Sequence, residues 1–223
     1  MKNISDNLKK LKSQLPANVK LVAVSKTQSV EAIKTAYDTG QKIFGENKVQ
    51  ELFAKYEKLK HLDIEWHLIG HLQTNKVKYI APFVDTIQSV DSFKLLKEID
   101  KEAKKHNRII KCLLQFYIAQ EETKFGLSYE EAINILESED VNNLQNICIC
   151  GVMGIASFTE DIEKIKSEFT VLKNCFVNLK ENYFKTKSEF IEISMGMSND
   201  WRIAIQQNST IIRIGSSIFG ERN

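Results

Sequence analysis

The chain has 223 residues, of which 43% are hydrophobic and 27% charged, as in an ordinary globular protein. Its 31 basic and 29 acidic residues leave a net charge of +2, so no strong field attracts nucleic acid or an anionic membrane surface. No segment is apolar for long enough to span a bilayer, and the N-terminus lacks the pattern of a secretory signal. We therefore expect a cytoplasmic protein. Because no linker rich in Gly, Ser or Pro divides it, we expect one domain over residues 1–223.

The predicted elements begin with an amphipathic helix and continue as strands that alternate with helices. Ile4, Leu8, Leu11 and Leu15 follow helical spacing, and Pro16 is expected to end this helix. The expected strands cover residues 21–24, 42–44, 66–69, 84–89, 110–116, 147–153, 190–193 and 210–214. Between them, four of the expected helices cover residues 47–59, 74–80, 92–105 and 199–206.

Three further helices are predicted from their capping residues. Ser29 is a good N-cap for a helix that ends at Gly40. Ser128 and Glu131 have the spacing of a capping box. Thr159 is expected to cap a long helix that ends near residue 179.

Strict alternation of strands and helices predicts a parallel sheet with right-handed crossovers. Eight such units favour an α/β fold with a single closed (β/α)₈ TIM barrel and an extra N-terminal helix. A doubly wound open sheet is the structural alternative. In a barrel the chemistry lies at the carboxyl ends of the strands, and polar residues and glycines of this sequence gather there.

Lys26 directly follows the first apolar strand. Partial desolvation lowers the pKa of a lysine in such a place and increases the neutral amine, which can attack an aldehyde to form a Schiff base. The alternative is that Lys26 extends into solvent or pairs with a nearby carboxylate such as Glu46.

A candidate anion site follows the last strand. The backbone N–H groups of residues 215–217, Gly-Ser-Ser, can point at phosphate oxygens, and Ser194 and Gly196 after the seventh strand can complete the cup. The alternative is a pair of ordinary turns.

Arg213 faces the same side as Gly215, because side chains alternate along a strand. It is therefore expected to point into the barrel mouth beside the ligand. A buried charge needs a partner, so the alternative role of Arg213 is a salt bridge with Glu192 or Asp85.

The histidines and cysteines do not suggest a metal site. His67 and His71 would be roughly 13 Å apart along one strand, too far to share an ion. Cys148 and Cys150 fall on one face of a strand, but a second metal-binding pair is missing. We expect the four cysteines to be reduced, buried and structural: Cys112, Cys148, Cys150 and Cys175.

Five segments, in this order along nearly the whole chain, resemble motifs of the pyridoxal phosphate homeostasis proteins. They are A-V-S-K-T at 23–27, F-G-E-N-K-V-Q-E at 44–51, W-H-L-I-G-H-L-Q-T-N-K at 66–76, S-M-G-M-S-N-D at 194–200 and R-I-G-S-S-I-F-G at 213–220. Each motif alone would be weak evidence, whereas five in order are highly specific. The resemblance implies a barrel of the alanine racemase N-terminal type that holds pyridoxal 5′-phosphate (PLP).

The resemblance also implies roles for individual residues. Lys26 matches the Schiff-base lysine and Arg213 the arginine that faces the pyridine nitrogen. Gly215 and Ser216 match backbone donors to the phosphate, and Ser194 matches a phosphate-binding hydroxyl. The expected cofactor-binding residues are Lys26, Asn47, Ser194, Met195, Gly196, Arg213, Gly215 and Ser216. The segments G-V-M-G-I-A at 151–156 and Q-F-Y-I at 115–118 depart from the family pattern, so the rim beside them is expected to differ.

The family is taken to bind PLP and buffer its supply without a firmly assigned reaction. We therefore expect a monomeric carrier or buffer in vitamin B6 homeostasis, with apo PLP-dependent enzymes as transient clients and no firm catalytic residue. A PLP-dependent racemase is the alternative: an arginine at the ring nitrogen weakens the electron sink without excluding chemistry. Because the sequence ends at Asn223, just beyond the last expected strand, we expect no second domain of the racemase kind. A Schiff-base aldolase without PLP ranks third.

Overall fold

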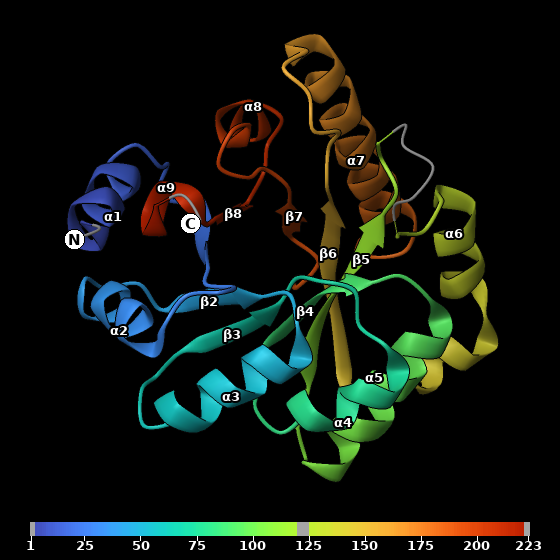
Figure 1. The fold of residues 1–223 in the computed structure, drawn as a ribbon. Helices are drawn as coiled ribbons and strands as arrows, with labels where there is room; N and C mark the ends of the chain where they lie inside the picture. Colours follow the sequence, from blue (N-terminus) through green and yellow to red (C-terminus); the bar gives the residue numbers. More distant parts are fainter. Residues whose placement is uncertain (1–2, 120–124, 221–223) are drawn as a thin grey trace.

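The computed structural model, which describes residues 3–119 and 125–220, is a closed barrel of parallel strands surrounded by helices (Figure 1). Neighbouring strands follow the order β1 to β8, and β8 pairs with β1 to close the barrel. The strands are β1 (Lys20–Val24), β2 (Ile43–Glu46), β3 (Glu65–Leu68), β4 (Thr86–Val90), β5 (Ile110–Phe116), β6 (Ile147–Gly154), β7 (Glu192–Ser194) and β8 (Ile211–Ile214). The predicted (β/α)₈ barrel is confirmed, and the open-sheet alternative is wrong.

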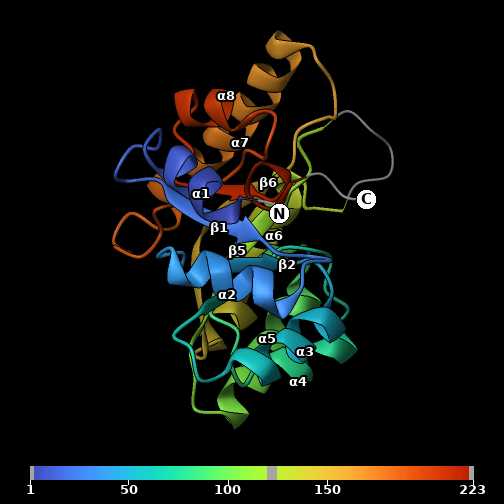
Figure 2. The same ribbon diagram turned by 60° about the vertical axis from the view of Figure 1, so that its left-hand side comes forward.

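Helices cover the outer face of the barrel, and one extra helix precedes β1. The α-helices are α1 (Ile4–Lys12), α2 (Val30–Asp38), α3 (Val49–Leu59), α4 (Val77–Ile80), α5 (Phe93–Lys105), α6 (Tyr129–Glu137), α7 (Ile162–Asn182), α8 (Trp201–Gln206) and α9 (Ser216–Phe219). The extra helix α1 packs against α2 and α9, so the first and last helices lie side by side (Figures 1 and 2). No helix among the described residues is long and apolar enough to cross a membrane.

The capping predictions are confirmed in two helices and wrong in a third. The Ser29 side chain accepts the N–H of Ala32, and the capping box of Ser128 and Glu131 is fully formed. The long helix α7 is capped by Asp161, whose side chain accepts the N–H of Lys164. The side chain of Thr159, the expected cap, instead accepts the N–H of Asp161 and lies two residues before the observed cap.

Other bounds shift for local reasons. Helix α1 ends at Lys12, before the proline expected to stop it. Residues 74–80 form a 3₁₀ turn, η1 (Thr74–Lys76), and the short α4 instead of one helix. Strand β7 begins at Glu192, two residues later than predicted, and the ring of Phe190 stacks on those of Phe176 and Phe184. The sequence did not predict η2 (Glu139–Asn143) or α9.

The barrel has an apolar core outside the sheet and a smaller one inside it. The inner cluster consists of Val22, Leu113, Cys150, Met153 and Ile211. A bulge in β6 lies opposite β5, where the pairing moves from Cys112↔Ile149 to Leu113↔Gly151. Gly151 has φ +155°, and a Cβ there would lie 1.9 Å from the Glu192 carbonyl oxygen. Glycine is therefore required at the point where β6 approaches β7.

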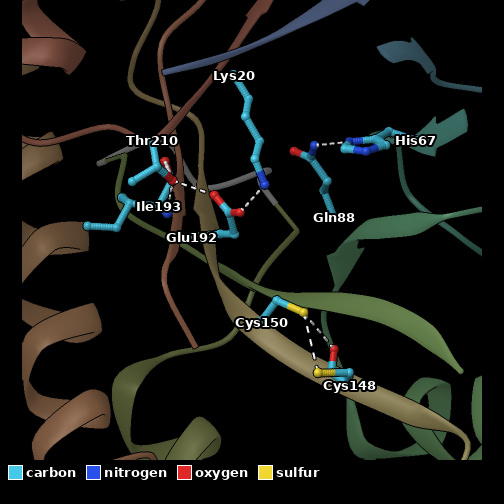
Figure 3. Close-up of polar contacts among 8 residues, drawn as sticks. All are labelled: Lys20, His67, Gln88, Cys148, Cys150, Glu192, Ile193 and Thr210. Carbon is cyan, nitrogen blue, oxygen red and sulfur yellow. Dashed lines mark hydrogen bonds and ion pairs between the residues drawn. The ribbon is translucent and has the colours of Figure 1, made fainter. Parts of the chain in front are cut away.

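All four cysteines are free thiols. Cys112, Cys150 and Cys175 are buried as expected, whereas Cys148 is partly exposed. The two cysteines of β6 do share one side of the strand, since their sulfur atoms lie 3.5 Å apart (Figure 3).

Candidate functional site at the barrel mouth

The predicted site residues follow the carboxyl ends of neighbouring strands. Lys26 comes after β1, Asn47 after β2, and Gly215 after β8. Strand β1 lies between the other two, with Ala23 paired to Phe44 on one side and to Ile214 on the other. The structure therefore brings the lysine, the amide and the glycine turn to one rim of the barrel.

Lys26 lies in a tight turn whose two flanking peptide groups are held by α3. The Lys55 Nζ donates to the Ser25 carbonyl oxygen at 2.6 Å, and Glu51 Oε1 accepts the N–H of Thr27 at 2.5 Å. Thr27 has φ +65°, an uncommon value for a residue with a β-branched side chain. These bonds fix the backbone on both sides of Lys26 and so fix the direction in which its side chain leaves the rim.

Lys55 and Glu51, which clamp the Lys26 turn, belong to a buried ion cluster. Lys55 Nζ lies 2.8 Å from Glu46 Oε1 and 2.6 Å from Glu51 Oε1, and the Ser25 hydroxyl donates to Glu46 at 2.6 Å. Burial raises the pKa of Glu46, although Lys55 and Ser25 oppose the shift. Burial also acts to raise the pKa of Glu51, but Lys55 and the Thr27 N–H outweigh it and the pKa is lowered. Glu46, which the sequence suggested as an alternative partner for Lys26, is thus held by Lys55 and Ser25.

Arg213 lies buried at the inner side of β8. Its Nη1 donates to Ser194 Oγ at 2.6 Å and its Nη2 donates to the Gly154 carbonyl oxygen at 2.9 Å. The alternative salt bridges are wrong: Glu192 pairs with Lys20 at 2.5 Å, and an Asp85 oxygen accepts the backbone N–H of residue 66. Burial lowers the pKa of Arg213 to about 10, which leaves the guanidinium charged at neutral pH.

Ser194 connects Arg213 to two further polar side chains inside the barrel. Its hydroxyl donates to Gln88 Oε1 at 2.7 Å, and Gln88 Nε2 lies 2.8 Å from His67 Nδ1 (Figure 3). Burial, with Lys111 and Lys20 adding to it, lowers the pKa of His67 to about 3. Since the hydroxyl proton of Ser194 is directed to Gln88, the phosphate-binding role expected for Ser194 stays a prediction.

The two histidines have separate surroundings. His67 is buried in the barrel interior, whereas His71 lies at the rim with its Nδ1 2.9 Å from an Asp91 oxygen. The His71 ring also stacks on Phe125, with 4.0 Å between the ring centroids. Among the residues that the structure describes, no group of three or more His, Cys, Asp or Glu side chains could hold a metal ion.

The loop after β7 approaches the mouth through a glycine. Met195 is fully buried. Gly196 has φ +97°, and a Cβ added there would lie only 2.6 Å from the Cβ of Ala204, so no larger residue fits. Asp200 accepts the N–H of Met197 and thereby closes the loop. Burial raises the pKa of Asp200, while that N–H and the charge of Arg213 oppose the shift.

The turn after β8 leads directly into α9. Gly215 is its N-cap, and the Gly215 carbonyl oxygen accepts the N–H groups of Ile218 and Phe219. The first N–H groups of a helix have no acceptor within that helix. Those of Ser216 and Ser217, which are exposed at the rim, are therefore oriented to meet an anion in front of the turn.

A cavity of about 270 Å³ lies beside Asn47, between the ends of β2, β3, β5 and β6. Gln115 and Ile155 line it, so the two segments that depart from the family pattern form part of its wall. Within the described part of the chain, the buried Asn47 Oδ1 has no hydrogen-bond partner. A buried oxygen in that state calls for a donor, which a bound ligand can supply. Lys26, Arg213 and Gly215 are not among the residues that line this cavity, which adjoins the predicted site on the β2 side. By their chemistry, an amine, a guanidinium and backbone N–H groups suit an aldehyde ligand with an anionic arm.

Several residues of the site were missed by sequence reasoning. The signal for Lys55 was present: it lies on the buried side of α3 and four residues after Glu51. Gln88 and Asp200 gave no signal of this kind, because their partners lie on other strands or across a loop.

The fold and the rim define a (β/α)₈ barrel of the kind found in alanine racemases. The family model described as "Alanine racemase, N-terminal domain" matches residues 1–223. The pyridoxal phosphate homeostasis protein of Aquifex aeolicus (strain VF5) is 41% identical over 203 residues, which are 91% of this chain and 87% of that protein. That of Pasteurella multocida (strain Pm70) is 37% identical, over 92% of this chain and 87% of its own. The chain therefore belongs to the family of pyridoxal phosphate homeostasis proteins.

A solved structure of a relative has a closely similar barrel. PipY of Synechococcus elongatus PCC7942, determined with PLP bound, superimposes with a TM-score of 0.90 at 36% sequence identity. The match covers 98% of this chain and 100% of that one. The resemblance inferred from the five motifs is thus confirmed.

Proposed function

We propose that this protein binds PLP at the barrel mouth, covalently through Lys26, and takes part in intracellular PLP homeostasis as a carrier or buffer. One observation carries the proposal: the clamped Lys26 turn, the buried Arg213 and the Gly215 turn belong to two adjacent strands, β1 and β8. These groups offer an amine for the aldehyde of PLP, a donor for its ring nitrogen and backbone N–H groups for its phosphate.

Each residue has a distinct task in this proposal. Lys26 would hold the cofactor: its amine would condense with the aldehyde of PLP, so that a C=N bond forms and the aldehyde oxygen leaves as water. The N–H groups of Ser216 and Ser217 at the start of α9, together with that of Gly215, would meet the phosphate, and Ser194, Met195 and Gly196 would form the wall beside it. Among the described residues, the buried Oδ1 of Asn47 has no hydrogen-bond partner. In the proposed complex it accepts a hydrogen bond from a donor that arrives with PLP.

Arg213 favours a carrier over a catalyst. A guanidinium can only donate, so it faces an unprotonated ring nitrogen, and an unprotonated ring is the weaker electron sink. Because Arg213 stays charged when buried, that preference holds at neutral pH. We further propose that the protein acts as a monomer in the cytoplasm and that apo PLP-dependent enzymes are its transient clients.

The test combines loading, anchoring and transfer. We expect the purified protein with added PLP to show a visible absorption band, and borohydride reduction followed by peptide mapping to find the pyridoxyl group on Lys26. Lys26→Ala should abolish the band, whereas Lys48→Ala, at an exposed position nearby, should not. The loaded protein should then activate an apo PLP-dependent enzyme and should not exchange the α-proton of amino acids in D₂O. An adduct elsewhere, or transfer unaffected by Lys26→Ala, would refute the proposal, and α-proton exchange would favour the racemase.

A further inference from the structure

A chain of four buried polar side chains crosses the interior of the barrel. It runs from Arg213 on β8 to Ser194 on β7, then to Gln88 on β4 and His67 on β3, through contacts of 2.6, 2.7 and 2.8 Å. Each of the four residues is at most 4% exposed. Side chains this deeply buried hold their hydrogen bonds in a low dielectric, where each bond polarises the next.

Arg213 sets the direction of the first bond in this hydrogen-bonded chain, and the other bonds run the same way. A guanidinium has no acceptor, so Ser194 Oγ accepts from it, and the Ser194 proton points at the Gln88 Oε1 that faces it. The amide NH₂ of Gln88 then faces His67, whose Nδ1 must accept. The proton of the neutral imidazole therefore lies on Nε2.

A second proton on His67 is incompatible with this arrangement. It would set the Nδ1–H of the imidazolium against the NH₂ of Gln88, and two donors facing each other leave a buried group without a partner. Burial together with the positive charges of Lys111 and Lys20 already lowers the pKa of His67 to about 3. The chain consequently keeps one proton arrangement across the pH range in which the protein is expected to work.

The His67 end of this hydrogen-bonded chain lies away from the barrel mouth. His67 lines a separate cavity of about 400 Å³ at the amino ends of the strands, where Lys20, Glu192 and Cys150 also contribute (Figure 3). A substitution of His67 can therefore reach the mouth through Gln88 and Ser194 without touching a ligand there.

We propose that Gln88 and His67 are positioning residues, which orient the guanidinium of Arg213 toward the ring of the bound cofactor. Arg213 is anchored by two neutral acceptors, Ser194 Oγ and the Gly154 carbonyl, so its orientation depends on how firmly Ser194 is held. Gln88 holds Ser194, and His67 holds Gln88. The effect on the cofactor rests on the proposed function, whereas the hydrogen-bonded chain belongs to the ligand-free barrel as well.

The hydrogen-bonded chain from Arg213 to His67 is tested on the ligand-free protein by long-range ¹H–¹⁵N NMR of the histidine rings. We expect His67 to be neutral with its proton on Nε2, and to stay so from pH 8 to pH 5. Arg213→Met removes the donor that sets the direction, so His67 should then show a mixture of both tautomers. A His67 with its proton on Nδ1, or one unchanged in both Arg213→Met and Gln88→Met, would overturn the assignment. Circular dichroism verifies that the variants are folded.

The positioning role is tested on the loaded protein with matched variants. His67→Leu removes the acceptor, and we expect it to shift the absorption band of bound PLP, change the pH dependence of the band and weaken PLP binding about threefold to tenfold. His67→Gln supplies an amide oxygen in place of Nδ1 and should restore most of the effect. His106→Gln, at an exposed helix end, is the control.

The outcomes separate the two proposals. Failure of the wild-type protein to bind PLP would refute the proposed function and leave the NMR result on the chain standing. A wild type that binds PLP, together with a His67→Leu variant of lower stability but unchanged spectrum and affinity, would show a structural role alone. That result would overturn the positioning role and leave the proposed function intact.

Discussion

Replacing Lys55 with methionine removes the ammonium group that three oxygen atoms share beneath the Lys26 turn. Those oxygens belong to Ser25, Glu46 and Glu51, at 2.6 to 2.8 Å from Nζ. The side chain of Lys55 is 8% exposed and that of Glu46 is fully buried. Breaking a buried pair on one side leaves an uncompensated charge, so we expect the free energy of unfolding to fall by about 3 to 5 kcal/mol at pH 7.

The loss should depend on pH with a definite sign. Burial raises the pKa of Glu46 in the folded protein, and Lys55 is the main group that opposes this shift. Without Lys55 the folded-state pKa rises further above that of the unfolded chain, so the folded variant takes up a proton more readily. The penalty is therefore fully present above the raised folded pKa, where the carboxylate is ionised, and shrinks as the pH falls from that pKa toward the unfolded value.

Urea unfolding at pH 7 and pH 5 measures both effects. Lys55→Met combined with Glu46→Gln removes the stranded carboxylate and should recover most of the stability. Lys60→Met, which breaks an exposed pair with Glu57, should cost about 0.5 kcal/mol or less. A Lys55→Met protein as stable as the wild type at pH 7, or one that Glu46→Gln does not rescue, would refute the reasoning. Slower uptake of PLP by the folded variant is the functional counterpart, since the turn around Lys26 loses one of its supports.

Three further predictions follow from single positions. Asn47→Leu removes a buried oxygen that has no hydrogen-bond partner among the described residues, so it should raise the stability of the ligand-free protein by roughly 1 kcal/mol while weakening PLP binding in an equilibrium titration. Gly151→Ala sets a Cβ 1.9 Å from the Glu192 carbonyl oxygen at φ +155°, so it should shift the barrel strands apart and lower the melting temperature by several degrees, whereas Ala at the exposed Glu160 should not. Burial raises the pKa of Cys150 to about 12 and that of Cys175 to about 11. At pH 7.5 iodoacetamide should therefore modify the partly exposed Cys148 first, which peptide mapping would detect. Equal labelling of all cysteines in the folded protein would contradict this.

The barrel could be predicted from the sequence because its signals are local. Apolar runs, capping residues and glycines each act over a few positions, and their strict alternation determines a closed parallel sheet. Polar residues at strand ends then meet at one rim by topology alone, which is why Lys26, Asn47 and Gly215 were found. Motif resemblance added the cofactor, which residue spacing could not specify.

The contacts that orient these residues could not be predicted in the same way. Ser194 and Gln88 are 106 positions apart and meet only because the barrel closes. The alternative of a salt bridge at Arg213 was wrong for the same reason: alternation predicts a side chain inside the barrel, but not that a hydroxyl and a carbonyl oxygen accept its hydrogen bonds there. Glu192 was already paired with Lys20 at the opposite end of the barrel, a competition that no local pattern records.

The two buried cations of the site are held in opposite ways, and the difference matches their tasks. Lys55 lies between two carboxylates, so its charge is neutralised within the protein and serves to hold the Lys26 turn. Arg213 is anchored by a hydroxyl and a carbonyl oxygen, while the nearby Asp200 directs its oxygen to the Met197 N–H. A buried cation held by neutral acceptors retains its field, which is costly in an apolar interior unless a ligand acceptor meets it. In the proposed function, the neutralised charge of Lys55 keeps the Lys26 turn in place, whereas the charge of Arg213 is available to the ligand that we propose for the mouth.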